Sequence, residues 1–144
     1  FIHQGRALSA LPYLSSGLAY VQFAVEEPEL FKMLFMRDRV SDGTLNEENQ
    51  DSTLDYVLTL VMRNTGLDRE DARRFHIHLW IYTHGMASML ATQFLVLSME
   101  EVELRLRDAY IATRRLFGLP PIPEDANYPT WRENPPVKPS EKLD

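Results

Sequence analysis

The sequence predicts an all-α fold, an antiparallel bundle of about five helices over residues 1–118, followed by a proline-rich tail over residues 119–144. Apolar residues of the first segment recur at spacings of three and four, the period of a helix, and no stretch alternates as a strand would. Seven of the nine prolines lie in the tail, whereas the body contains only Pro12 and Pro28. The chain has 144 residues, of which 44% are hydrophobic, and is therefore long enough to enclose a single core.

Two helices are expected in the first part of the chain. The first runs from about Ser9 to Val25, because its apolar side chains are spaced three and four apart and form one stripe, which comprises Leu11, Leu14, Leu18, Val21 and Val25. The second begins at Pro28, whose fixed φ and missing N–H suit a first helical turn, and it carries apolar residues as far as Met36. Residues 37–50 are polar and contain a turn signal, Asp42-Gly43, so we expect a loop there.

Two more helices are expected in the middle of the chain. The third starts near Asp51 or Ser52 and ends before Gly66, which can adopt a left-handed cap. Its expected buried positions are Leu54, Val57, Leu58 and Val61. Asp68 is a suitable N-cap for a long fourth helix, which we expect to continue to about Leu95.

The last helix is marked at both ends. Ser98 and Glu101 form a capping-box pattern that opens it, and it ends near Phe117 with Gly118 beyond. Its apolar residues form one narrow stripe, so we expect one face to be covered and the other to be in water. Two ion pairs at i,i+4 spacing are expected on the wet face: Glu101/Arg105 and Glu103/Arg107.

The expected fourth helix carries apolar or small side chains on nearly every side. One of its stripes contains the small residues Gly85, Ser88 and Thr92, which would let another helix approach closely. Such a helix is covered either inside a monomeric bundle or by a second subunit, and the limited length of the chain favours the second subunit. The last two helices then form the interface of a homodimer, with Met86, Leu90, Phe94, Val102, Leu106, Ala109 and Thr113 as the expected contact residues.

Composition and motifs exclude several classes of protein. The absence of cysteine rules out disulfides and thiolate metal sites and fits the cytoplasm, and no apolar run is long enough to cross a membrane. A net charge of -6 disfavours direct binding to DNA phosphates. His76 and His78 are two apart on a helix and point to different sides, and there is no Gly-x-Ser-x-Gly motif or glycine-rich phosphate loop. We therefore expect no metal, no cofactor and no enzymatic activity.

Two runs of residues resemble a known family. The run WIYTHGMASMLA carries Trp80, His84 and Gly85, and it resembles the Trp/His-Gly signature helix of one group of TetR/AcrR regulator C-terminal domains. Upstream, the run YVQFAVEEPELFKMLF, which starts at Tyr20, resembles the same group's Tyr-x-x-Phe-Ala…Pro-Glu-Leu…Phe segment. The resemblance spans roughly residues 8–117.

The resemblance implies a dimeric sensor. In such domains the last two helices pair across a twofold axis, and the earlier helices enclose a pocket for a small apolar effector. The implied function is that of the effector-sensing and dimerisation domain of a transcriptional repressor. The sequence begins at Phe1 without a preceding helix-turn-helix, so we expect DNA binding to occur only through an N-terminal domain upstream.

Candidates for lining the pocket are aromatic or polar residues on otherwise apolar faces: Tyr20, Phe23, Phe31, Met36, Tyr56, Trp80, His84 and Ser88. A buried histidine such as His84 either bonds to its neighbours or contacts a ligand. Two alternatives remain open: a helical-bundle enzyme or haem-type cofactor protein that uses His84, and a helical adaptor with a filled core. The tail carries Ile122, Tyr128 and Trp131, and we expect it to wrap around the bundle.

Overall fold

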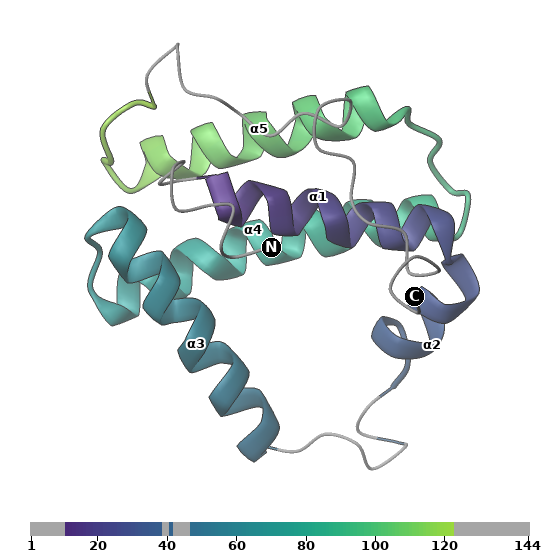
Figure 1. Ribbon diagram of the computed structural model, residues 1–144, viewed down its shortest axis with the longest axis horizontal. Helices are drawn as coiled ribbons and strands as arrows, with labels where there is room; N and C mark the ends of the chain where they lie inside the picture. Colours follow the sequence, from purple (N-terminus) through teal and green to yellow (C-terminus); the bar gives the residue numbers. More distant parts are fainter. Residues whose placement is uncertain (1–10, 39–40, 42–46, 123–144) are drawn as a thin grey trace, which may run out of the picture.

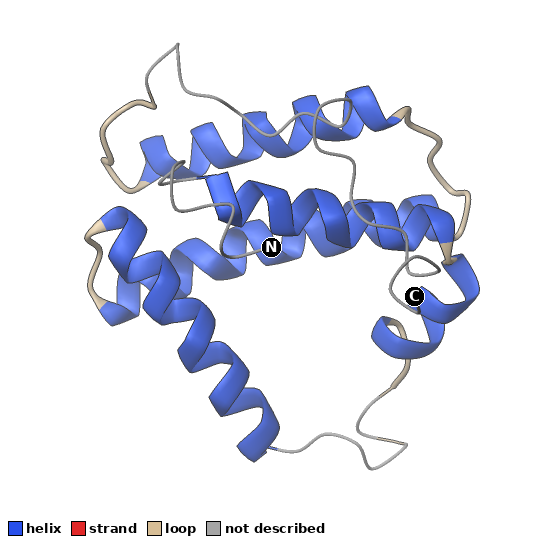
Figure 2. Ribbon diagram, in the orientation of Figure 1, coloured by secondary structure: helices blue, strands red, loops and turns tan. Residues whose placement is uncertain are grey.

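The fold is entirely helical in the part of the chain that the structure, a computed structural model, describes, namely residues 11–38, 41 and 47–122. Figure 2 shows helices and loops and no strand in this part. The five helices are α1 (Leu11–Glu26), α2 (Pro28–Phe35), α3 (Glu47–Thr65), α4 (Arg69–Ala91) and α5 (Met99–Leu116). The predicted fold class and the number of helices are confirmed.

Helices α1, α4 and α5 pack on one another and form the centre of the molecule (Figure 1). Helix α5 returns antiparallel to α4, as predicted. Helix α1 runs in the same direction as α4, because Tyr13 near its start contacts His76 and Tyr20 further along contacts His84. Helix α2 packs on α1 and α4, whereas α3 packs on α4 and projects from the central helices.

A single core lies between the helices. Its largest fully buried side chains include Phe31 from α2, Phe75 from α4 and Tyr110 from α5. Burying an aromatic side chain of this size stabilises the fold by about 1.5–3 kcal/mol. The predicted stripe of α1 faces this core through Leu14, Leu18 and Val21, but Val25 at its end is exposed. No helix in the described residues is both long and apolar enough to cross a membrane.

Three helices start where the sequence predicts, and two of them, α4 and α5, are capped by side-chain hydrogen bonds. Pro28 opens α2, and the carboxylate of Asp68 accepts from the N–H of Asp71 (2.8 Å) at the start of α4. At the start of α5, Ser98 Oγ accepts from the N–H of Glu101 and the Glu101 carboxylate accepts from the N–H of Ser98, so the capping box is complete. Of the two ion pairs predicted on α5, Glu103/Arg107 forms (3.0 Å), whereas the carboxylate of Glu101 is used by the cap.

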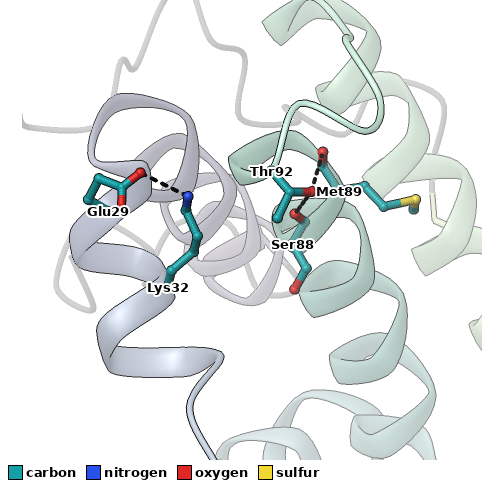
Figure 3. A network of polar contacts seen from close by, with 5 residues as sticks. All are labelled: Glu29, Lys32, Ser88, Met89 and Thr92. Atoms are coloured by element: carbon teal, nitrogen blue, oxygen red, sulfur yellow. Dashed lines mark hydrogen bonds and ion pairs between the residues drawn. The ribbon is translucent and has the colours of Figure 1, made fainter.

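The end of α4 corrects the prediction, since the helix stops at Ala91 rather than near Leu95. Gln93 has φ 58, and the N–H groups of Gln93 and Phe94 bond to the carbonyls of Leu90 and Met89. This is the Schellman pattern, which usually has glycine in the left-handed position. Figure 3 shows that the Thr92 hydroxyl also donates to the carbonyls of Ser88 (2.8 Å) and Met89 (3.3 Å). Phe94 and Leu95 therefore lie in the loop that leads to α5.

Helix α3 begins earlier than predicted, at Glu47 rather than near Asp51. Residues 47–50 form the first turn of α3 instead of the end of the loop. The predicted loop of residues 37–50 is shorter by that turn, and its signal at Asp42-Gly43 lies outside the described residues.

The first residues of the predicted tail pack on the body. Leu119 and Ile122 are partly buried against the core, and Arg114 Nη2 donates to the carbonyl of Pro120 (2.8 Å). Gly118 follows the end of α5 at the place that the sequence predicts, and it adopts a left-handed conformation with φ 66. Tyr128 and Trp131, which we expected to dock as well, lie outside the described residues.

Candidate functional site

Five rings from three helices meet around Tyr20 of α1. We call them the Tyr20 cluster. They are the rings of Tyr20 in α1, of Phe31 and Phe35 in α2, and of Trp80 and His84 in α4. The centroid of the Tyr20 ring lies 5.4 Å from that of Phe31, 5.1 Å from those of Phe35 and Trp80, and 6.1 Å from that of His84. These distances are within the range in which aromatic pairs attract each other.

Helical spacing explains how the sequence assembles the cluster. Phe31 and Phe35 are four apart on α2, and Trp80 and His84 are four apart on α4, so each pair lies on one face of its helix. Phe31 is fully buried and anchors α2 against the core. Pro28 starts α2 directly after α1 ends, which turns the two phenylalanines back toward Tyr20.

The polar centre of the cluster is a hydrogen bond of 2.7 Å between the Tyr20 hydroxyl and His84 Nδ1. Burial raises the pKa of Tyr20 above its usual range, so the phenol keeps its proton. Burial lowers the pKa of His84, so the imidazole is neutral near pH 7. Among the described residues the Tyr20 hydroxyl has no other acceptor, so we assign it as the donor to Nδ1, which places the ring proton of His84 on Nε2.

A second tyrosine–histidine pair lies one step back along the same two helices. Tyr13 of α1 and His76 of α4 share a hydrogen bond of 2.7 Å between the hydroxyl and Nδ1. Trp80 lies between the two histidines, with interplanar angles of 29° to His76 and 28° to His84. Tyr13 is more deeply buried than Tyr20 and contacts Phe75 and Tyr110 of the core. The pair at His76 thus packs against the core, whereas the pair at His84 is closer to the surface.

The Tyr20 cluster is only partly covered by the protein. Trp80 and Phe35 are each 41% exposed to solvent, although they contact other rings of the cluster. Ligand-binding sites are lined mainly by apolar and aromatic side chains, with a few polar groups at defined positions. The cluster is therefore the candidate binding site of the described residues.

Five of the eight residues predicted to line a pocket come together here. Tyr20, Phe31, Trp80 and His84 belong to the Tyr20 cluster, and Phe23 contacts it through Phe31 and Phe35. The other three are not part of the cluster: Met36 is exposed at the C-cap of α2, Tyr56 is exposed on α3, and Ser88 lies one helical turn beyond His84 on α4. Phe35 and the Tyr13/His76 pair are site residues that were not predicted, although the spacings Phe31/Phe35 and His76/Trp80/His84 indicate them.

Most of the residues predicted at a dimer interface have neighbours within their own chain. Met86, Leu90, Val102 and Leu106 are buried in the core, and Ala109 packs against it, so this placement does not fit the prediction that they face a second subunit. The first four belong to the same core cluster as Leu14, Leu18 and Val21 of α1. Thr113 is partly buried and donates to the carbonyl of Ala109, and Phe94 alone of the seven is highly exposed (84%).

A different face of α4 is exposed and apolar. It carries Ile81 (65% exposed), Tyr82 and Met89, and a Cβ atom added to Gly85 would meet nothing within 4 Å. Leu104 on α5 is also exposed. Trp80 and His84 lie on an adjoining side of α4, so the helix takes part in the core, the Tyr20 cluster and this open face.

The described residues contain no group of three histidine, cysteine, aspartate or glutamate side chains that could hold a metal ion. The chemistry available at the Tyr20 cluster is therefore aromatic contact and neutral hydrogen bonding.

Comparison with known proteins gives one match. A family model described as a tetracycline repressor-like C-terminal domain matches residues 14–112, about two thirds of the chain. The matched segment contains the whole Tyr20 cluster and runs from α1 into α5. No curated protein and no solved structure matches the chain.

Proposed function

The chain belongs to the family of tetracycline repressor-like C-terminal domains, and we propose that it senses a small apolar effector and forms the homodimer of a transcriptional repressor. Domains of this family are regulatory rather than enzymatic. The chain carries a net charge of -6 and would repel phosphates, so in this proposal a separate helix-turn-helix segment outside this sequence contacts DNA. The proposed place of action is the cytoplasm.

The observation that carries the effector half of the proposal is the partial exposure of the Tyr20 cluster. Trp80 and Phe35 present apolar surface next to the imidazole of His84, and an apolar molecule would remove this surface from water. The polar group beside the rings would fix the orientation of the molecule.

A neutral fluorescent probe, N-phenyl-1-naphthylamine, tests the effector half. We expect its emission to rise on binding to the full chain and Trp80→Ala to weaken the binding. Tyr56→Ala is the matched control, because Tyr56 is an exposed aromatic residue of α3 away from the cluster. Failure of the probe to bind, or equal losses in both variants, would contradict the Tyr20 cluster as the effector site.

The dimerisation half rests on the exposed face of α4. Ile81, Tyr82 and Met89 form an apolar surface on one side of a helix whose other side is already buried. The small residue Gly85 within this surface leaves room for a second helix to approach. We propose that α4 and α5 pair with those of a second subunit through this face, together with Leu104 and Phe94.

Sedimentation velocity of the full chain tests the dimerisation half. A dimer is expected at micromolar concentration, and Ile81→Glu is expected to give monomers, because it would bury a charge in the interface. Leu30→Glu makes the same change at an exposed apolar residue of α2 and should leave the dimer intact. A monomeric wild-type chain would contradict the proposal.

A further inference from the structure

We propose that the Tyr20 cluster selects neutral, planar aromatic ligands that carry a hydrogen-bond acceptor such as a carbonyl oxygen. In this arrangement His84 Nε2–H donates to the acceptor, and the exposed rings of Trp80 and Phe35 contact the plane of the ligand. The inference rests on the proposed function, because it takes the cluster to be the effector site. It goes further by naming the class of molecule that the site accepts.

The hydrogen-bond donor follows from the partner of His84. Nδ1 accepts from the Tyr20 hydroxyl, so the second nitrogen of the neutral ring is an N–H. Within the described residues no hydrogen bond is found for Nε2, and His84 is only partly buried. A donor in such a position gains most from a ligand that brings its own acceptor, since an unpaired polar group in an apolar contact is costly.

The planar shape follows from the way in which Trp80 is held. Its ring lies between the imidazoles of His76 and His84 at interplanar angles below 30°, and Tyr20 contacts it at 5.1 Å. These contacts fix the orientation of the indole before any ligand arrives. A fixed aromatic surface favours flat ligands, which stack on it without losing internal rotations.

The preference for a neutral ligand follows from the polar groups of the cluster itself. The polar members of the cluster are a phenol, whose pKa is raised by burial, and an imidazole, whose pKa is lowered by burial. Neither supplies a positive charge near pH 7. A carboxylate placed against these rings would lose water without gaining an ionic partner from them, whereas a carbonyl would lose much less.

A pair of probes of the same shape tests the inference. 2-Acetylnaphthalene carries a carbonyl oxygen, and 2-isopropenylnaphthalene has a CH₂ group in its place. By titration calorimetry of the full chain, we expect the ketone to bind roughly three- to tenfold more tightly than the alkene, the effect of one neutral hydrogen bond. 2-Naphthoate, which adds a charge, is expected to bind more weakly than the ketone.

Two matched variants assign the donor. His84→Phe keeps a ring and removes the donor, so it should reduce the preference for the ketone to about one while the alkene still binds, which also shows that the site is folded. His78→Phe makes the same change at an exposed histidine of α4 that contacts Phe117 and not the Tyr20 cluster, so it should leave the preference unchanged. A loss of preference in both variants would overturn the assignment to His84.

The remaining outcomes separate this inference from the proposed function. Equal binding of ketone and alkene to the wild-type chain, or tighter binding of 2-naphthoate, would overturn the ligand class and leave an apolar effector site intact. Failure of both naphthalenes and of N-phenyl-1-naphthylamine to bind would overturn the inference and the effector half of the proposed function together.

Discussion

Tyr20 and His84 are 64 residues apart in the sequence, and a hydrogen bond of 2.7 Å joins them. Tyr13 and His76 repeat the same bond seven residues earlier on α1 and eight residues earlier on α4. Since a helix rises about 1.5 Å per residue, the two bonds are about 10–12 Å apart along both helices. A shift of α1 along α4 would break both of them, so the two bonds set the register of the parallel helices.

Loss of either hydroxyl is expected to destabilise the fold. Tyr20→Phe should lower the free energy of unfolding by about 1 kcal/mol, and Tyr13→Phe by more, because Tyr13 is more deeply buried and its loss leaves a buried nitrogen unpaired. Urea denaturation measures both. Tyr56→Phe removes an exposed hydroxyl and should leave the stability unchanged. If Tyr56→Phe lowered the free energy of unfolding as much as Tyr20→Phe does, the Tyr20–His84 hydrogen bond would contribute nothing to stability.

Stability is expected to fall when the pH falls through 6.5, the ordinary pKa of histidine. Burial lowers the pKa of His76 and of His84 in the folded chain, so below 6.5 the unfolded chain binds protons that the folded chain does not. Stability therefore rises with pH over this window. Urea midpoints at about pH 7.5 and about pH 5.5 should differ more for the wild type than for the double variant His76→Phe/His84→Phe. Equal differences would contradict the assignment.

Gly85→Ala should affect the monomer and the dimer in opposite directions. The added methyl group meets nothing within 4 Å, and alanine favours the helix by about 1 kcal/mol over glycine, so the fold itself should become more stable. A second helix packed against Gly85 would be pushed away, and the dimer should weaken roughly tenfold. Sedimentation at several concentrations gives the dissociation constant. Asn64→Ala, on the exposed side of α3, should raise helix stability without changing dimerisation.

Two helix ends in the same left-handed conformation should respond oppositely to substitution. Gln93→Gly removes the cost of a side chain at φ 58 and should stabilise the fold by about 1 kcal/mol. Gly118→Ala introduces that cost at φ 66 and should destabilise it by about the same amount, since no atom obstructs the new methyl group. Thermal unfolding of the two variants measures both effects, and changes of the same sign would show that the backbone angle is not the cause.

Helical periodicity and capping residues predict most of the fold. Pro28, Asp68, Ser98 and Gly118 mark helix ends where the structure has them, because each uses a local mechanism that depends on only a few neighbouring residues. The end of α4 could not be predicted in this way, because Gln93 adopts a left-handed conformation for which the sequence has no signal. The steric cost there is outweighed by the hydrogen bonds of the cap.

The candidate site was less predictable than the fold. Aromatic residues on helix faces indicated Tyr20, Phe31 and Trp80, but the sequence does not tell which apolar stripe of α4 meets which neighbour. The sequence therefore assigns Met86 and Leu90 to a partner, although both are buried within the chain, and it does not assign Ile81 to the open side. When a helix is apolar on several sides, its sequence does not show which side faces the core.

Among the described helices, α3 packs on α4 alone, whereas α1, α4 and α5 each contact the other two. Detaching α3 breaks one helix interface and leaves the central three-helix core in place. Its amide hydrogens should therefore exchange with solvent through a partial opening that costs less free energy than global unfolding. The helices therefore differ in how readily they open, and Tyr20, Trp80 and His84 belong to the three-helix core that opens last.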